Sequence, residues 1–216
     1  MKVLVVVAHP DDELLGAGPL IWMHLHAGHD VRVQVFTENS ARHGMKGASD
    51  ISLETAAKAW GYIVSSWNME DQSLDTVRMS HLTQCLEASL KSFTPDLVYT
   101  HLAEDLNRDH RAVSEMCRVV FRRFATLVEF PTPSSSEYLI APWMPNWYVP
   151  LDEGVVDMTW EAFQTAYPQE VAPYPHARSK EAHKAFYAAG GAASGASYAI
   201  PLKVVHLRGI MGDIWK

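Results

Sequence analysis

The sequence predicts an α/β fold built on a mostly parallel β-sheet. Two observations carry this prediction. Short apolar segments alternate along the chain with segments of helical periodicity, and the first of them, residues 2–8 (KVLVVVA), is apolar almost throughout. Continuous apolar runs of this kind are typical of strands that helices cover on both faces, as in parallel sheets. Alternating strands and helices favour the same architecture.

The start of the chain predicts one β-α-β unit. Residues 2–8 form its first strand, residues 14–25 an apolar helix that Gly28 ends, and residues 31–36 (VRVQVF) its second strand. A helix that connects two parallel strands in this way makes a right-handed crossover. We therefore expect the first strand to lie inside the sheet with its carboxyl end directly before a helix.

The middle of the chain continues the alternation after a Gly- and Ser-containing loop over residues 37–49. Gly61 and Pro95 mark the ends of two helices. Apolar spacing predicts helices over residues 53–60, 79–90 and 113–124, and apolar runs predict strands over residues 96–100 and 127–130.

The last third of the chain is less regular. Residues 131–175 are rich in Pro, Ser, Trp and Tyr, with one short helix expected near residues 159–167. A long irregular segment in a compact domain is usually functional, so we expect a lid or a pocket wall. A helix over residues 179–189, a Gly/Ala turn over residues 190–195 and a strand over residues 199–207 follow. No linker or internal repeat divides the chain, so residues 1–216 are expected to form a single domain.

Composition excludes several classes of protein. The chain has 216 residues, 48% apolar and 20% charged, which is typical of a globular protein, and its net charge of -7 argues against nucleic-acid binding. No apolar run approaches the ~20 residues of a membrane span, and the first run is too short for a signal peptide. We therefore expect a soluble, cytoplasmic protein with reduced thiols at Cys85 and Cys117.

Two segments with the same design carry the chemistry, in a chain with 11 His and 2 Cys. Residues 9–13 (HPDDE) and residues 105–110 (DLNRDH) each follow a short apolar strand and lead into a helix. Sites in open α/β sheets form outside the carboxyl ends of the strands. If the two strands are neighbours, one crevice receives the side chains of His9, Asp11, Asp12, Asp109 and His110.

These residue types fit a catalytic metal. Two imidazoles and a carboxylate are the three-ligand set of a zinc ion that keeps one position open for water. Of the adjacent Asp11 and Asp12, one can be the carboxylate ligand of the metal and the other a general base. The alternative is that both segments are ordinary turns whose Asp residues cap helices. The occurrence of both segments at strand-to-helix junctions favours the metal site.

The residues AHPDDE after an N-terminal strand resemble the signature of the LmbE-like, or PIG-L, family of zinc-dependent de-N-acetylases, which act on N-acetylglucosaminyl compounds and related amides. Residues 107–110 (NRDH) match a variant of the second family motif, H-x-D-H, and residues 130–138 (FPTPSSSEY) and 175–179 (PHARS) resemble later family segments. The resemblance implies a Rossmann-like three-layer fold with extra C-terminal strands. Related proteins are often oligomers, so a homo-oligomer is one expectation.

The resemblance also implies residue roles. His9, Asp12 and His110 are expected to bind zinc, Asp11 to act as general base, and Asp109 to orient a ligating imidazole. Fe²⁺, Co²⁺ or Mn²⁺ could occupy the same donor set.

Two positions depart from the family pattern. Many members carry a His where this chain has Asn107, and that His helps to stabilise the oxyanion. An Asn amide donates a hydrogen bond but carries no positive charge, so Asn107 is a candidate catalytic residue and a second donor is expected, with His101 and Arg178 as candidates. Ile51 stands where many members have an Arg, three residues before the Glu that matches Glu54, so a substrate contact is missing or moved.

Further candidate substrate contacts lie in loops and at a strand end. The predicted set is Arg42, His43, His101, His176 and Arg178. An apolar wall against a sugar face is a second prediction, with Trp143, Trp147 and Tyr148 as its candidates.

The expected function is removal of an N-acetyl group from an amino sugar of the N-acetylglucosamine type, or from a sugar-containing small molecule. The same metal chemistry on a non-sugar amide, such as a thiol conjugate or an antibiotic intermediate, is the nearest alternative. A nucleotide-dependent oxidoreductase predicts G-x-G-x-x-G after the first strand, where this chain has AHPDDE. A catalytically inactive sugar-binding module predicts a broken metal set, and Asn107 keeps that alternative open.

Overall fold

The computed structural model describes residues 1–38, 48–136 and 139–208, without the side chains of residues 48–50. Its strands form one seven-stranded sheet in the order β3-β2-β1-β4-β5-β7-β6. The strands are β1 (Lys2–Val7), β2 (Asp30–Thr37), β3 (Ile63–Met69), β4 (Leu97–His101), β5 (Thr126–Phe130), β6 (Trp147–Leu151) and β7 (Tyr198–His206). The first five are parallel, whereas β7 pairs antiparallel with β5 and with β6.

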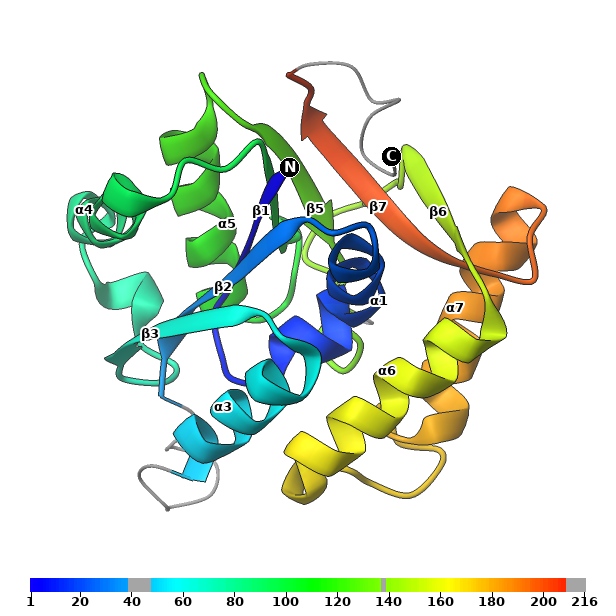
Figure 1. Cartoon of the computed structure of the whole chain (residues 1–216). Helices are drawn as coiled ribbons and strands as arrows, with labels where there is room; N and C mark the ends of the chain where they lie inside the picture. Colours follow the sequence, from blue (N-terminus) through cyan, green and yellow to red (C-terminus); the bar gives the residue numbers. More distant parts are fainter. Residues whose placement is uncertain (39–47, 137–138, 209–216) are drawn as a thin grey trace.

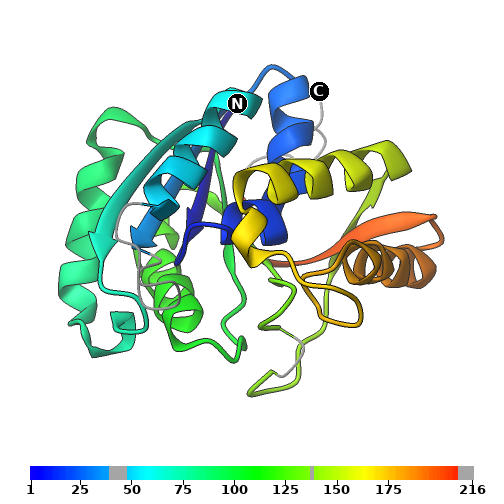
Figure 2. The same ribbon diagram turned by 90° about the horizontal axis from the view of Figure 1, so that it is seen from below.

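Helices cover both faces of this sheet (Figures 1 and 2). One apolar cluster joins Val3, Val5 and Val7 to helices of one layer, and another joins Leu4 and Val6 to helices of the opposite layer. The first layer contains α1 (Asp12–His26), α3 (Ala48–Trp60), α6 (Glu153–Ala166) and α7 (Lys180–Ser194), and the second contains α4 (Met79–Ser89) and α5 (Arg108–Phe121). The predicted three-layer α/β fold is confirmed.

The order of the strands brings the two motifs together. β1 pairs in parallel with β2 on one side and with β4 on the other. The chain moves from β1 outward to β3 and then returns to β4, so β1 and β4 flank the point where the strand order reverses. Ligands of open α/β sheets bind at this point, outside the carboxyl ends of the strands. The condition that the two motif-bearing strands are neighbours is therefore met.

Three predictions about elements are wrong. β3 and β6 were not expected, and both are outer strands with exposed positions along their length. The turn expected over residues 190–195 belongs mostly to α7, which ends at Ser194. Gly190 and Gly191 lie inside that helix. A Cβ atom at either position would collide with the backbone near Ala199 or Ser197, so Gly is required there. They permit close packing of α7 on β7.

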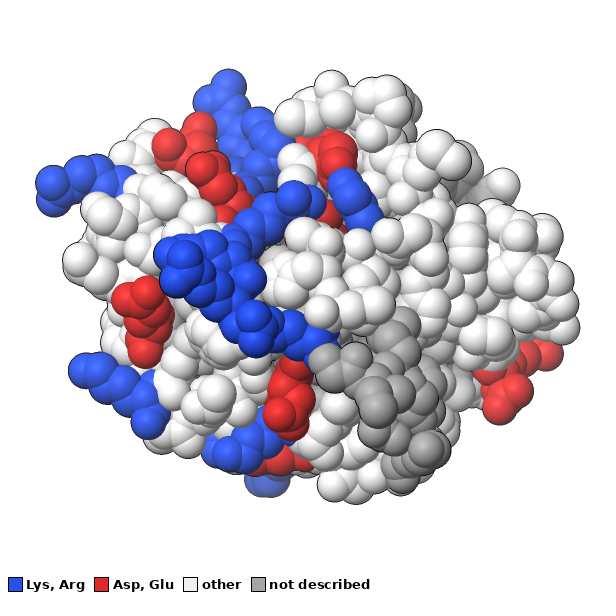
Figure 3. All heavy atoms as spheres, turned by 90° about the horizontal axis from the view of Figure 1, so that it is seen from above, with Lys and Arg blue, Asp and Glu red and all other residues white. Residues whose placement is uncertain are grey.

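The end of the sheet where the parallel strands begin, opposite the two motifs, carries a different surface. Seen from above, Lys and Arg side chains form a band beside scattered Asp and Glu (Figure 3). The last turn of α5 lies at this end of the sheet, because α5 runs back from the carboxyl end of β4 to the start of β5. Arg122 and Arg123, which follow α5, are exposed. This basic surface is separate from the motif residues. Among the described residues, no helix is both long and apolar enough to span a membrane.

Candidate metal centre

Neither motif is a simple helix cap formed by an Asp side chain. Asp11 precedes α1 but makes no capping hydrogen bond with its side chain. At α5 the capping residue is Asn107, whose Oδ1 accepts hydrogen bonds from the backbone N–H groups of Asp109 and His110. The alternative interpretation, in which the Asp residues act as caps, is therefore wrong, and their carboxylates are free for other contacts.

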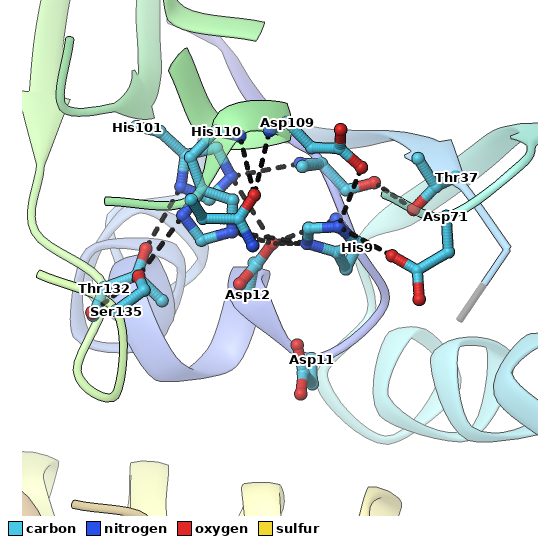
Figure 4. A network of polar contacts seen from close by, with 12 residues as sticks. His9, Asp11, Asp12, Thr37, Asp71, His101, Asp109, His110, Thr132 and Ser135 are labelled. Carbon is cyan, nitrogen blue, oxygen red and sulfur yellow. Dashed lines mark hydrogen bonds and ion pairs between the residues drawn. The ribbon is translucent and has the colours of Figure 1, made fainter. Parts of the chain in front are cut away.

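Three donor atoms form a nearly equilateral triangle between the two motifs (Figure 4). His9 Nδ1 lies 3.1 Å from Asp12 Oδ2 and 3.2 Å from His110 Nε2, and the last two atoms are 3.2 Å apart. A four-coordinate zinc ion with bonds near 2.0 Å holds its ligand atoms about 3.3 Å apart. The three residues are 7%, 2% and 2% exposed, respectively. The spacing and the donor types thus fit a zinc-sized ion.

Carboxylates behind the two imidazoles set which ring nitrogen faces the triangle. His9 Nε2 lies 3.1 Å from Asp71 Oδ1 and 3.2 Å from Asp109 Oδ2, and His110 Nδ1 lies 3.2 Å from Asp105 Oδ2. When these outer nitrogens donate to carboxylates, the inner nitrogens keep lone pairs for a metal. The structure thus places Asp109 behind His9. The grouping of His9, Asp71 and Asp109 is the outer side of the same centre.

The electrostatics of the centre favour a positive ion. Although burial lowers the pKa of His110, Asp12 and Asp105 raise it to about 9. Burial also lowers the pKa of His9, but hydrogen bonds to Asp109 and other carboxylates bring it well above its usual value. Four buried carboxylates surround the two rings: Asp12, Asp71, Asp105 and Asp109. A divalent cation would supply the positive charge that this arrangement attracts.

We expect the metal affinity of the metal-free protein to rise with pH up to about 9. A protonated imidazole cannot bind a metal, and the pKa of His110 without metal is about 9. Below that value each pH unit should raise the affinity at least tenfold, because His110 has to lose a proton before the ion binds and the pKa of His9 is raised as well. Chelator competition at several pH values, corrected for the protonation of the chelator, measures this slope. An affinity independent of pH would contradict the role of His110.

Asp105 is a functional candidate that the sequence reasoning missed. Its Oδ1 accepts the N–H of Asn107, and its Oδ2 accepts the hydroxyls of Ser135 and Ser136 at 3.0 and 2.7 Å as well as contacting His110. It therefore ties the loop after β4 to the loop after β5. Its position at the start of the DLNRDH segment, directly after a strand, was the available signal.

Replacing Asp105 with Asn should weaken metal binding about 10- to 100-fold. The change removes the charge that holds the outer N–H of His110, and such orienting contacts typically contribute this much affinity. Chelator competition measures the effect, with Asp152→Asn as a matched exposed control. If both variants bind metal as the unchanged protein does, Asp105 has no orienting role.

Asp71 and Gln72 were also missed, and they lie in the loop after the unexpected strand β3. The N–H of Gln72 donates to Asp109 Oδ2 at 2.9 Å, and its side chain donates to Asp71 Oδ1 at 3.1 Å. This loop is therefore held against the start of α5 by the same Asp109 carboxylate that contacts His9. No motif in the sequence marked it.

Asp11 has the properties of a general base. Burial raises the pKa of its carboxyl to about 7, against the opposing charge of Arg178. Its Oδ2 accepts a hydrogen bond from Arg178 Nη1 at 2.8 Å. A base with a pKa near the working pH is the most effective. In Figure 4 its carboxylate lies apart from the hydrogen-bonded cluster of the two rings.

Glu13 holds the backbone of Asp11. Asp11 has φ 109°, a conformation that is uncommon for residues other than Gly, and its N–H donates to Glu13 Oε2 at 2.9 Å. The Tyr167 hydroxyl donates to the other oxygen of Glu13 at 2.7 Å. The C-terminal part of the chain thus supports the conformation of the first motif.

One cavity of about 440 Å³ is lined by the three residues of the triangle and by Asp11. The irregular segment contributes part of its wall, as predicted, although through Thr132, Ser134 and Ser135. The apolar-wall candidates Trp143, Trp147 and Tyr148 are not among its described lining residues, which are His9, Asp11, Asp12, Asp71, Gln72, Asn107, His110, Thr132, Ser134, Ser135 and Arg178.

The predicted substrate contacts have different positions. Arg178 lines the cavity. His101 is fully buried beneath it: its Nε2 accepts the N–H of Ala8, its Nδ1 contacts Thr132, and burial lowers its pKa to about 4. His176 is exposed, and its ring accepts the N–H of Arg178. Neither His101 nor His176 is a described lining residue. Arg42 and His43 lie outside the described residues.

Comparisons with known proteins agree with this arrangement. A family model described as PIG-L, GlcNAc-PI de-N-acetylase, matches residues 4–121. A conserved protein from Thermus thermophilus has a similar structure, with a TM-score of 0.80, 21% identity and coverage of 97% of both chains. No curated protein matches.

Two further solved structures carry named activities. An N,N'-diacetylchitobiose deacetylase from Pyrococcus horikoshii has a TM-score of 0.73 and 17% identity over 98% of this chain and 88% of that one. A 4-carboxy-2-hydroxymuconate hydratase from Pseudomonas putida has a TM-score of 0.65 and 19% identity over 97% and 98%. At these identities the likeness concerns the fold. The family match covers more than half of the chain and includes both motifs, and the chain therefore belongs to the PIG-L family.

Proposed function

We propose that this chain is a zinc-dependent hydrolase that removes an N-acetyl group from an amino sugar or a sugar-containing small molecule. The observation that carries the proposal is the triangle of His9, Asp12 and His110 in one cavity with Asp11. Membership of a de-N-acetylase family supports the reaction type.

The three residues of the triangle would hold the metal. When bound, the ion supplies Lewis acidity, which activates water and polarises an acyl carbonyl. Asp109 and Asp71 keep His9 oriented for it, and Asp105 does the same for His110. Fe²⁺, Co²⁺ and Mn²⁺ suit the same donor types, so elemental analysis of the purified protein has to identify the ion.

Asp11 moves the proton in the proposed reaction. Its Oδ2 is held by Arg178, which leaves Oδ1 to take a proton from the attacking water. The same carboxyl then returns the proton to the nitrogen of the departing amine as the C–N bond breaks. Asn107, whose Oδ1 is occupied by the start of α5, can offer its amide N–H groups to the substrate.

The lining of the cavity supports a polyhydroxylated substrate. Its neutral residues are hydroxyl- or amide-bearing, namely Gln72, Asn107, Thr132, Ser134 and Ser135. Such groups exchange hydrogen bonds with sugar hydroxyls and gain little from an apolar amide. The N,N'-diacetylchitobiose deacetylase shares this fold, which supports a sugar substrate, and a hydratase shares the fold as well.

A matched substrate panel tests the proposal. The metal-loaded protein is incubated with N-acetylglucosamine, N,N'-diacetylchitobiose, N-acetylcysteine and a simple N-acetyl alkylamine, and released acetate is measured. We expect acetate from the sugars, loss of release after chelation and recovery after zinc is added. Release from the non-sugar compounds alone would favour the alternative amidase. Release from none of a widened panel by fully metal-loaded protein would contradict the proposal.

A further inference from the structure

Hydrolysis of an amide creates a negatively charged oxygen on the former carbonyl, and fixed donors or positive charges stabilise it best when they are in place beforehand. Among the described residues that line the cavity, Arg178 is the one whose side chain is permanently positive. His101 is not part of this lining, and its Nε2 already accepts the N–H of Ala8. Arg178 is therefore the side chain to consider.

Arg178 comes from outside the part of the chain that the family model matches. It lies in the segment just before α7, whereas the match ends at residue 121. Its side chain is 10% exposed and reaches the first motif across a sequence separation of 167 residues. The C-terminal segment thus places the guanidinium of Arg178 at the cavity, together with the buried Glu170 carboxylate that contacts it.

The guanidinium of Arg178 is held by three hydrogen bonds. Nε donates to Ser134 Oγ at 2.9 Å, and Nη1 donates to Asp11 Oδ2 at 2.8 Å and to Glu170. Because the group is planar, these contacts also fix the direction of Nη2. Nη2 makes no hydrogen bond to any other residue within the described ranges. One pair of strong donors is thus held in place and left for a ligand.

Two uncommon backbone conformations converge on this guanidinium. Asp11 has φ 109° and Ser134 has φ 82°, and each accepts a hydrogen bond from Arg178. Such conformations cost free energy in residues other than Gly and persist where the surroundings enforce them, often at functional sites. Their meeting at one side chain indicates that the position of Arg178 is built into the cavity.

The contact with Asp11 places Arg178 next to the reaction. A general base has to lie within hydrogen-bond reach of the water that it deprotonates. Arg178 binds the other oxygen of the same carboxylate. Its charge therefore lies beside the carboxylate that would deprotonate the water, and both side chains are largely buried, where charges interact strongly.

We propose that Arg178 is a catalytic residue that binds, through Nη2, the acyl oxygen as it becomes an oxyanion; this inference rests on the proposed function. As the water oxygen bonds to the acyl carbon, its proton passes to Asp11 and the C=O π electrons move onto the acyl oxygen beside Arg178. When the C=O bond re-forms, the C–N bond breaks and the nitrogen receives the proton from Asp11. The products are the free amine and acetic acid, which loses its remaining proton to solvent and becomes acetate.

The test compares Arg178→Gln and Arg178→Lys with the unchanged protein, and Arg123→Gln serves as an exposed control. Methylphosphonate, a small tetrahedral oxyanion, is the binding probe, measured by calorimetry on protein with verified metal content. We expect at least tenfold weaker binding by Arg178→Gln, an intermediate loss for Arg178→Lys and no change for Arg123→Gln. Acetate release by Arg178→Gln should fall about 10²–10³-fold in kcat.

The binding and activity measurements separate the two proposals. Equal methylphosphonate affinity in the unchanged protein and in Arg178→Lys and Arg178→Gln, or no binding by the unchanged protein, overturns the role of Arg178. If the unchanged protein releases no acetate, the proposed function fails, but the binding comparison still decides whether Arg178 holds an oxyanion. If Arg178→Gln does not fold, as judged by circular dichroism, Arg178→Lys and its affinity decide the question.

Discussion

Replacing Asp11 with Asn should lower kcat for acetate release by about 10²–10⁴-fold and leave the metal content unchanged. The amide keeps the shape of the carboxyl but cannot take a proton from water. Asp11 does not belong to the triangle of donor atoms, so the metal should remain bound. Steady-state kinetics and elemental analysis on the same preparation measure both quantities.

The pH dependence of the rate of acetate release is a second test of Asp11 as the base. Burial raises its pKa to about 7, so its base form is lost as the pH falls through that value. The rate of the unchanged protein should therefore decline below about pH 7, and the residual rate of Asp11→Asn should lack this limb. Asp152→Asn is the exposed control for the substitution itself. Near-normal turnover by Asp11→Asn would exclude it as the base.

Replacing His110 with Ala should abolish stable metal binding and, with it, acetate release. The change deletes one of three donor atoms that lie within 3.2 Å of one another. It also leaves the buried carboxylates of Asp12 and Asp105 without their shared partner. Breaking a buried ion pair from one side costs about 3–5 kcal/mol of folding stability, so the metal-free variant should also unfold at a lower temperature.

Elemental analysis and thermal unfolding measure the two effects of His110→Ala. His81→Ala is the control, because His81 is exposed on α4. Full metal occupancy in His110→Ala would rule His110 out as a ligand. Loss of metal with unchanged stability in the chelated state would instead show that Asp12 and Asp105 tolerate the loss of their partner.

The sequence predicted the parts of the fold that are buried on both faces. β1 is apolar after Lys2, and helices cover both of its faces, so its pattern was unambiguous. β3 alternates between exposed and half-buried positions, and β6 contains Pro150. Both are outer strands, where one edge needs no partner and polar residues are tolerated. Local sequence carries little signal for such strands.

The residues of the site also fall into a group that the sequence predicts and a group that only the assembled fold shows. Each motif puts its key residues next to one another in the sequence, so a shared crevice with His9 and His110 could be predicted once two strands were taken as neighbours. The choice of Asp12 as the third ligand came from the family resemblance. Asp71 and Asp105 act on imidazoles that other segments supply, and only the assembled fold shows those contacts. His101 and Arg178 were both candidate oxyanion donors in the sequence. Only their burial and their positions relative to the cavity distinguish them.

Acetate release from N,N'-diacetylchitobiose tests the central claim most directly, measured with one preparation in its metal-loaded, chelated and zinc-restored forms. Metal-dependent N-deacetylation predicts release by the first form, none by the second and recovery in the third, with Asp11→Asn inactive although metal-loaded. Unchanged release by the chelated protein, or equal release by Asp11→Asn, would contradict the account.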